Sequence, residues 1–195
     1  MIICLIQYQG LSLPENRIDL YNIATSTLLD NWVKKRTRYG KPSLTVKQLV
    51  GYLSPVAFYM QENCDEGLIK ENDFRDQLFK VCREKTYGKD DLQIEREVDE
   101  IISYVKEDAG FLQEIGTDGF GVGQFSFMHL TFQEYFSAIR FVTKWEKGLS
   151  LEELREYVLA PYWNEVLVLA AEELFQSSSD PELGCERVSR FVDAI

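Results

Sequence analysis

One glycine-rich turn between two extended runs limits the architectures that this chain can adopt. The runs are residues 111–115 and 124–128, and the turn over residues 116–123 contains four glycines. Two short extended runs joined by such a turn predict a β-hairpin. Apolar residues elsewhere recur with helical spacing, so we predict a mainly α fold with one two-stranded hairpin.

Two helices are predicted near the N-terminus. The first should begin with Ser12 as cap, Pro14 in the first turn and Glu15 closing a capping box, and it should run to about residue 38. The second should be capped by Ser43. We expect this helix to bend at Pro55, because proline has no amide hydrogen to donate.

Two further helices are predicted before the hairpin. One should begin at Asn72 or Asp73, after a short apolar step at residues 68–69, and the other at about Asp91. The side chains predicted to be buried by the four helices are Ile18, Tyr21, Thr25, Leu28, Leu29, Trp32, Leu49, Leu53, Val56, Met60, Phe74, Leu78, Phe79, Val81, Cys82, Ile94, Val98, Ile101, Ile102 and Val105.

The helix after the hairpin has its own predicted start. Thr131 and Glu134 have capping-box spacing, and Leu130 with Tyr135 has the spacing of a hydrophobic staple. Its predicted buried face consists of Phe132, Phe136, Ile139 and Val142. Helices followed by a hairpin whose second strand leads into a helix outline a winged helix. Helices are predicted again from residue 151, with a loop at residues 177–180 before the last one.

The charge balance argues against a nucleic-acid-binding winged helix. The formal net charge is −11, and the basic residues gather at residues 34–41, outside the hairpin and the helix after it. As a DNA-binding domain, the chain would use the helix after the hairpin as its recognition helix, and we expect the exposed residues of that helix to include Gln133, Glu134 and Ser137. A DNA-binding regulator stays an alternative, which a salt-dependent gel shift would test.

The four cysteines, Cys4, Cys64, Cys82 and Cys185, form no CxxC pair. We therefore predict no metal site and expect reduced, mostly buried thiols. The chain has neither a secretory signal pattern nor an apolar run long enough to cross a bilayer, so a cytoplasmic protein without membrane contact is predicted.

No catalytic residues are predicted from the motifs. The sequence lacks a complete GxxxxGK[ST] phosphate-binding loop, and the acidic pair Asp90 and Asp91 is expected to start a helix. His129 is the one histidine, and no nucleophile stands beside it as a triad would need. It lies between an extended run and a helix start, where an imidazole can point into a cleft. Composition alone favours a partly buried histidine bonded to backbone.

Three motifs resemble NACHT-family signalling NTPases of the STAND class. Residues 127–138 (FMHLTFQEYFSA) resemble the FxHxxFQEYFxA signature, and residues 13–21 (LPENRIDLY) resemble the LPxxRxxLY segment that follows the nucleotide-binding core. Residues 162–171 (YWNEVLVLAA) resemble the WxEVxLLAA start of the C-terminal sensor. The resemblance implies three parts: the end of a helical subdomain (1–42), a winged-helix domain (43–146) and the first helical-repeat-like helices of a sensor (151–195).

The resemblance also implies a function. In that family an upstream P-loop domain binds ATP or ADP with Mg²⁺, and the winged-helix histidine contacts the β-phosphate of ADP in the closed state. Sensor engagement leads to nucleotide exchange and homo-oligomerisation, with innate immunity or anti-phage defence as the expected setting. On this basis we assign only His129 as a nucleotide contact and expect Gln133, Glu134 and Tyr135 to cap and pack the next helix.

The phosphate-binding loop of the family is missing from these residues. We therefore expect a fragment or a remnant of an NTPase, with no catalytic activity of its own. A helical protein-interaction module that uses no nucleotide is the second alternative, and nucleotide-independent partner binding would support it.

Overall fold

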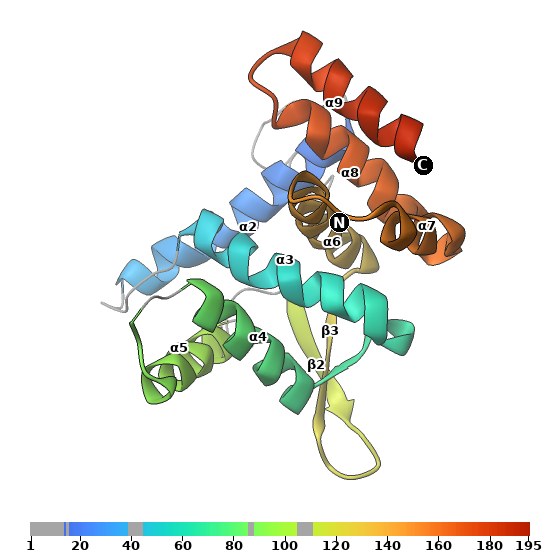
Figure 1. Cartoon of the computed structure of the whole chain (residues 1–195). Coiled ribbons are helices and arrows are strands. Elements are labelled where there is room, and N and C mark those ends of the chain that lie inside the picture. The colour runs from blue at the N-terminus through green and yellow to red at the C-terminus, as the bar shows by residue number, and fades with distance from the viewer. Residues whose placement is uncertain (1–13, 15, 39–44, 86–87, 105–110) are drawn as a thin grey trace. The chain divides into compact units, whose positions relative to one another are not determined.

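The computed structural model describes residues 14, 16–38, 45–85, 88–104 and 111–195 (Figure 1). This part of the chain is mainly helical and contains a small antiparallel sheet, as the sequence predicts. No helix within it is both long and apolar enough to cross a membrane. The chain forms two compact units, Thr25–Gln133 and Met1–Ala24 with Glu134–Ile195, which are described separately. The boundaries predicted from the family resemblance remain predictions.

The first unit has the order of elements of a winged helix. Its elements are α3 (Val46–Asn63), η1 (Asp65–Gly67), β1 (Ile69–Lys70), α4 (Glu71–Lys85), α5 (Asp91–Tyr104), β2 (Leu112–Thr117) and β3 (Gly123–Phe127). The predicted hairpin is confirmed as β2 and β3. The sheet has a third strand, because Ile69 pairs with Phe125 and places β1 beside β3 in the order β1-β3-β2. The two-stranded wing is thus confirmed, and the short strand β1 is an addition to the sheet that the sequence analysis did not predict.

Capping boxes start two helices of this unit. The Thr45 hydroxyl accepts a hydrogen bond from the Gln48 amide at 3.2 Å, and the Gln48 side chain accepts one from the Thr45 amide at 2.8 Å. Thr45 therefore caps α3 in place of the predicted Ser43, which lies outside the described residues. Asp90 and Gln93 form the same reciprocal pair before α5, which confirms the acidic pair as a helix start.

The predicted apolar faces form the core of this unit. The Phe74 and Phe125 rings lie 5.8 Å apart, and Phe111 meets Phe132 edge to face at 4.9 Å. The described positions that were predicted to be buried and are buried in α3, α4 and α5 are Leu49, Leu53, Val56, Met60, Phe74, Leu78, Val81, Cys82, Ile94, Val98, Ile101 and Ile102. Phe79 is partly exposed, and of the described cysteines only Cys82 is buried, so the expectation of mostly buried thiols was wrong.

An aspartate orders the tip of the wing. The Asp118 carboxylate accepts hydrogen bonds from the amides of Phe120 at 2.9 Å and Val122 at 3.0 Å, and it lies 3.3 Å from the Lys70 ammonium group. The bonds from Val122 and Phe120 hold the pKa of Asp118 below its ordinary value. Gly121 supplies the positive φ of 81° that the turn needs. Phe120 stands at the tip with 92 % of its surface exposed.

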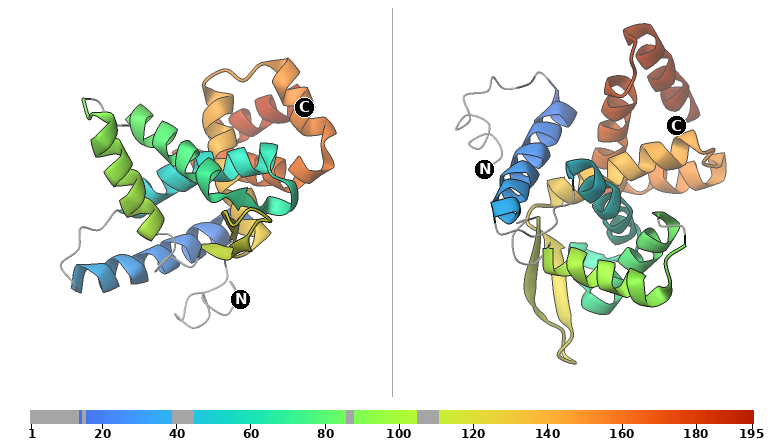
Figure 2. Two further views of the ribbon diagram at one scale, coloured as in Figure 1. Left: turned by 90° about the horizontal axis from the view of Figure 1, so that it is seen from below. Right: turned by 90° about the vertical axis from the view of Figure 1, so that its left-hand side faces the viewer.

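The second unit consists of helices. It contains the first part of α2 (Arg17–Arg38) and most of α6 (Leu130–Glu146), and then α7 (Leu151–Leu159), η3 (Pro161–Trp163), α8 (Asn164–Gln176) and α9 (Pro181–Ala194). The helices predicted after residue 151 and the loop before the last one are confirmed. Helices α8 and α9 lie side by side (Figure 2).

Helix α2 begins later than the sequence suggested. Asn16 is its cap, because the Asn16 side-chain oxygen accepts a hydrogen bond from the Asp19 amide at 2.9 Å. The predicted cap at Ser12 lies outside the described residues, and the first helical residue is Arg17. Ile18, Tyr21 and Thr25 are buried, as the periodicity predicts, whereas Leu28 is partly exposed. The predictions for the side chains of Leu29, Trp32 and Val105 fall outside what the structure describes.

Helix α6 begins two residues earlier than the predicted cap at Thr131 implies, because its first helical residue is Leu130. The Met128 amide still donates to the Phe111 carbonyl at 2.7 Å, so the strand ladder leaves one residue, His129, for the turn into the helix. The Phe132 amide then donates to the His129 carbonyl at 3.0 Å. Thr131 consequently lies inside the first turn instead of capping it. Leu130 is 57 % exposed, so the predicted staple is not formed.

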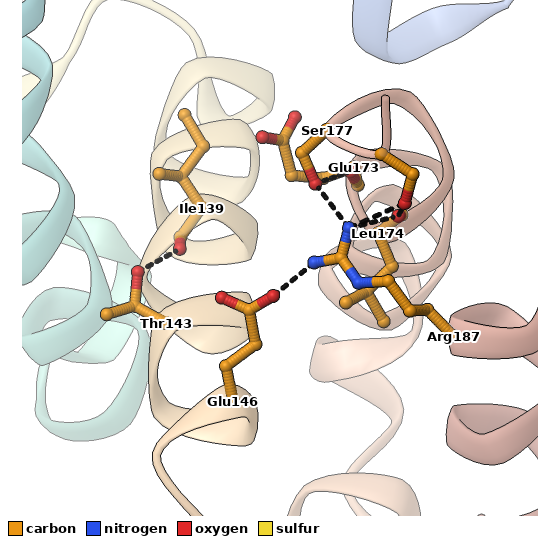
Figure 3. A network of polar contacts seen from close by, with 8 residues as sticks. Ile139, Thr143, Glu146, Glu173, Leu174, Ser177 and Arg187 are labelled. Carbon is orange, nitrogen blue, oxygen red and sulfur yellow. Dashed lines mark hydrogen bonds and ion pairs between the residues drawn. The ribbon is translucent and has the colours of Figure 1, made fainter. Parts of the chain in front are cut away.

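Arg187 of α9 joins three helices in this unit (Figure 3). Its guanidinium donates to the Leu174 carbonyl at 2.9 Å and to the Ser178 hydroxyl at 2.7 Å, at the C-terminal end of α8. It also pairs with the Glu146 carboxylate at the end of α6. A cation at this place satisfies carbonyl oxygens that the last turn of α8 leaves without partners.

Candidate functional site

His129 is exposed at the junction between β3 and α6. Strand β3 is the central strand of the sheet, and the buried Phe127 and Phe132 anchor the chain on either side of the histidine. Among the residues that the structure describes, no side chain hydrogen-bonds to the imidazole. The alternative of a partly buried, backbone-bonded histidine is therefore wrong. The ring faces solvent.

Gln133, four residues after His129, packs helix α6 against the rest of the first unit, as the family resemblance implies. Its side-chain amide donates to the Gln61 carbonyl oxygen at 2.8 Å, and both residues are buried. Gly67 makes room for this pair, because a Cβ atom there would lie 3.1 Å from the Gln133 oxygen. The prediction that Gln133 and Ser137 are exposed was wrong: they are 3 % and 0 % exposed.

We expect Gln133→Leu to lower the free energy of unfolding by about 1–3 kcal/mol, because the buried Gln61 oxygen loses the hydrogen bond that Gln133 donates. The double variant Gln61→Leu/Gln133→Leu should lose less than the sum of the two single variants, since it removes both polar partners. Urea unfolding of the four proteins measures this coupling. Additive losses would mean that the hydrogen bond does not contribute to stability.

The helix-turn-helix consists of α4 and α5, so the recognition position belongs to α5 and not to α6. The sequence prediction that the helix after the hairpin is the recognition helix was therefore wrong, as the strand order and the burial of α6 show. Helix α5 carries five acidic residues and one arginine: Asp91, Glu95, Glu97, Asp99, Glu100 and Arg96. Such a helix repels a phosphate backbone, which argues against the DNA-binding alternative.

Comparison with known families supports the interpretation of the fold. The family model of the winged helix-turn-helix domain C-terminal to NACHT matches residues 17–141. The chain belongs to this family. The comparison with curated proteins gave no match, and neither did the comparison with solved structures. A winged-helix domain of this family implies an upstream NACHT nucleotide-binding domain.

Two of the three motifs in this NACHT-associated chain meet through aromatic side chains. Tyr21 from the first motif and Tyr135 from the second have ring centroids 5.7 Å apart. The Tyr135 hydroxyl also donates to the Asn22 side chain at 2.6 Å. Tyr135 is buried and therefore packs the helix, as predicted.

The third motif joins the first through an ion pair. Arg17 lies 2.5 Å from the Glu165 carboxylate, and the Ile18 amide donates to Glu172 at 2.8 Å. Sequence reasoning did not assign Arg17 or Glu165. Their opposite charges were the available signal, but 148 positions separate them and no local pattern connects residues so far apart.

Glu134 lies near this ion pair. Burial raises its pKa first, the Glu165 carboxylate raises it further, and Arg17 opposes both effects. In the described part of the chain, no three His, Cys, Asp or Glu side chains are grouped as a metal site requires. Side chains from the three motifs thus pack against one another in the second unit.

Proposed function

We propose that this winged-helix domain holds an upstream NACHT domain in its ADP-bound, inactive state. Engagement of a C-terminal sensor would be relayed through the domain to nucleotide exchange and homo-oligomerisation, in a signalling or defence setting. The single observation that carries this proposal is the exposed imidazole of His129 between β3 and α6 in a domain from this family.

The chemistry of His129 fits a phosphate contact. A neutral imidazole carries one N–H donor and a protonated one carries two, and either can donate to an anionic phosphate oxygen. The backbone carbonyl of His129 accepts a hydrogen bond from the Phe132 amide, while the side chain of His129 faces solvent. The imidazole can therefore approach a ligand bound by another domain. The upstream domain would supply the amide cradle for the phosphates and the Mg²⁺ ion.

Helix α6 supports the relay. It is a continuous helix of 17 residues that begins directly after His129 and ends at Glu146. At 1.5 Å per residue it extends over about 25 Å. Arg187 of α9 pairs with Glu146 at the far end of this helix, and this contact with the C-terminal helices supports the proposed relay.

The chain by itself is expected to bind neither ATP nor ADP tightly and to hydrolyse neither, because one histidine contact does not replace a phosphate cradle. Titration calorimetry of this chain and of the same chain joined to its NACHT domain would test the expectation. The joined protein should bind nucleotide. Micromolar affinity of the chain alone for ATP or ADP would show that the nucleotide site lies in these residues. It would contradict the proposal that the upstream NACHT domain supplies that site.

A further inference from the structure

Two consecutive residues in the loop between α3 and β1 have a left-handed backbone. Glu66 has a φ of 57° and a ψ of 14°, and Gly67 has a φ of 67°. In the part of the chain that the structure describes, Glu66 is the one residue other than glycine with a positive φ. A Cβ atom makes this conformation costly, so such a residue keeps it only where surrounding contacts determine the backbone.

The loop is attached to buried elements at both ends. At its start the Cys64 amide donates to the Met60 carbonyl of α3 at 3.0 Å. At its end Ile69 pairs with Phe125 of the central strand β3, and both side chains are buried. The position of Gly67 is therefore determined from both sides.

The side chain of Gln133 lies against this loop and against the end of α3. A Cβ atom at Gly67 would lie only 3.1 Å from the side-chain oxygen of Gln133. The side-chain nitrogen of Gln133 donates to the Gln61 oxygen at 2.8 Å, and both glutamines are buried. We call this arrangement the Gln133 contact. It joins the first turn of α6 to α3 and to the loop.

His129 stands directly before the turn that the Gln133 contact holds. The first helical residue of α6 is Leu130, and Gln133 follows His129 by four positions, which is about one helical turn. Between them, the amide of the buried Phe132 donates to the His129 carbonyl at 3.0 Å. The backbone of His129 is thus bonded to the same turn whose next residue is Gln133.

We propose that Gln133 is a positioning residue for His129. The Gln133 contact fixes the first turn of α6 against Gly67 and Gln61, and it thereby fixes the point from which the imidazole reaches a phosphate. The functional consequence of this inference rests on the phosphate contact proposed above for His129. The positioning itself can be measured without any nucleotide.

Selective labelling tests the positioning. His129 is the one histidine of the chain, so the full chain made with ¹⁵N-histidine gives a single backbone amide signal. The order parameter of such an amide is about 0.85 in an ordered backbone and below about 0.6 in a flexible one. We expect the ordered value in the wild type, and the flexible value in Gln133→Ala and in Gly67→Ala. Gln133→Ala removes the hydrogen bond to Gln61, and Gly67→Ala pushes against Gln133 from the loop.

Glu66→Gly is the matched control in the same loop. The side chain of Glu66 is exposed, and glycine accepts its φ of 57° without strain, so the order parameter of the His129 amide should stay at the wild-type value. An ordered His129 amide in folded Gln133→Ala would overturn the positioning role. If that variant does not fold, an ordered amide in Gly67→Ala would do so. A flexible amide in the wild type would overturn it as well.

ADP release from the chain joined to its NACHT domain measures the functional consequence. Gln133→Ala should speed release roughly tenfold, and His129→Ala/Gln133→Ala should release ADP no faster than His129→Ala alone. Additive effects would show that Gln133 does not act through His129. Unchanged release in His129→Ala would refute the phosphate contact, and the order parameter would still decide the positioning role.

Discussion

His129→Ala is expected to release ADP from the full-length protein roughly ten- to a hundred-fold more readily. A hydrogen bond to a charged group contributes about 1.5–3 kcal/mol, and the proposed bond exists only in the closed, ADP-bound state. Its loss therefore shifts the closed-to-open equilibrium by that factor. The measurement is the dissociation rate of a fluorescent ADP analogue from the full-length protein, with and without the substitution.

The melting temperature separates this prediction from a structural effect. His129 is exposed, so its replacement should change stability by no more than about 0.5 kcal/mol. His129→Gln is the matched variant, because it keeps a side-chain donor and should restore part of the ADP retention. If His129→Ala folds normally and releases ADP at the wild-type rate, the imidazole does not hold the nucleotide.

Phe141→Ala is expected to lower the free energy of unfolding by about 3–5 kcal/mol, the usual cost of emptying a fully buried aromatic site. Phe141 is 0 % exposed. Its ring centroid lies 5.4 Å from that of Tyr157, 6.3 Å from that of Trp163 and 5.9 Å from that of Phe191. One side chain on α6 thus contacts α7, η3 and α9 together.

Urea unfolding followed by tryptophan fluorescence measures this loss. Leu159→Ala is the control, because Leu159 is exposed and its truncation should cost at most about 0.5 kcal/mol. A loss below about 1 kcal/mol in Phe141→Ala would mean that the helices after α6 do not share a core with it.

The local elements of this chain could be predicted from its sequence. Helical spacing of apolar residues located α2, α3, α4 and α5, and the glycine-rich turn located the β2–β3 hairpin. Both signals depend on neighbours within a few positions, so they can be recognised in the sequence without knowledge of long-range contacts. The two-residue strand β1 is too short to show any period, and its pairing with β3 joins residues 56 positions apart in Ile69 and Phe125.

Helix starts were less predictable because several polar residues compete for each cap. Thr45 and Asn16 form the caps that Ser43 and Ser12 were expected to form. At α6, the capping-box spacing of Thr131 and Glu134 was misleading. The strand ladder at Met128 fixes where the chain can turn, and this long-range constraint overrides the local motif.

The sequence by itself determined the position of His129 between a strand and a helix, because the surrounding motif is contiguous. Only the tertiary structure decided that this histidine is exposed while Gln133 and Ser137 are buried. It also decided that α5 takes the recognition position and that Arg17 meets Glu165. Periodicity shows that a helix has an apolar face, but the direction of that face and the pairing of distant charges depend on what packs against it, which no local pattern contains.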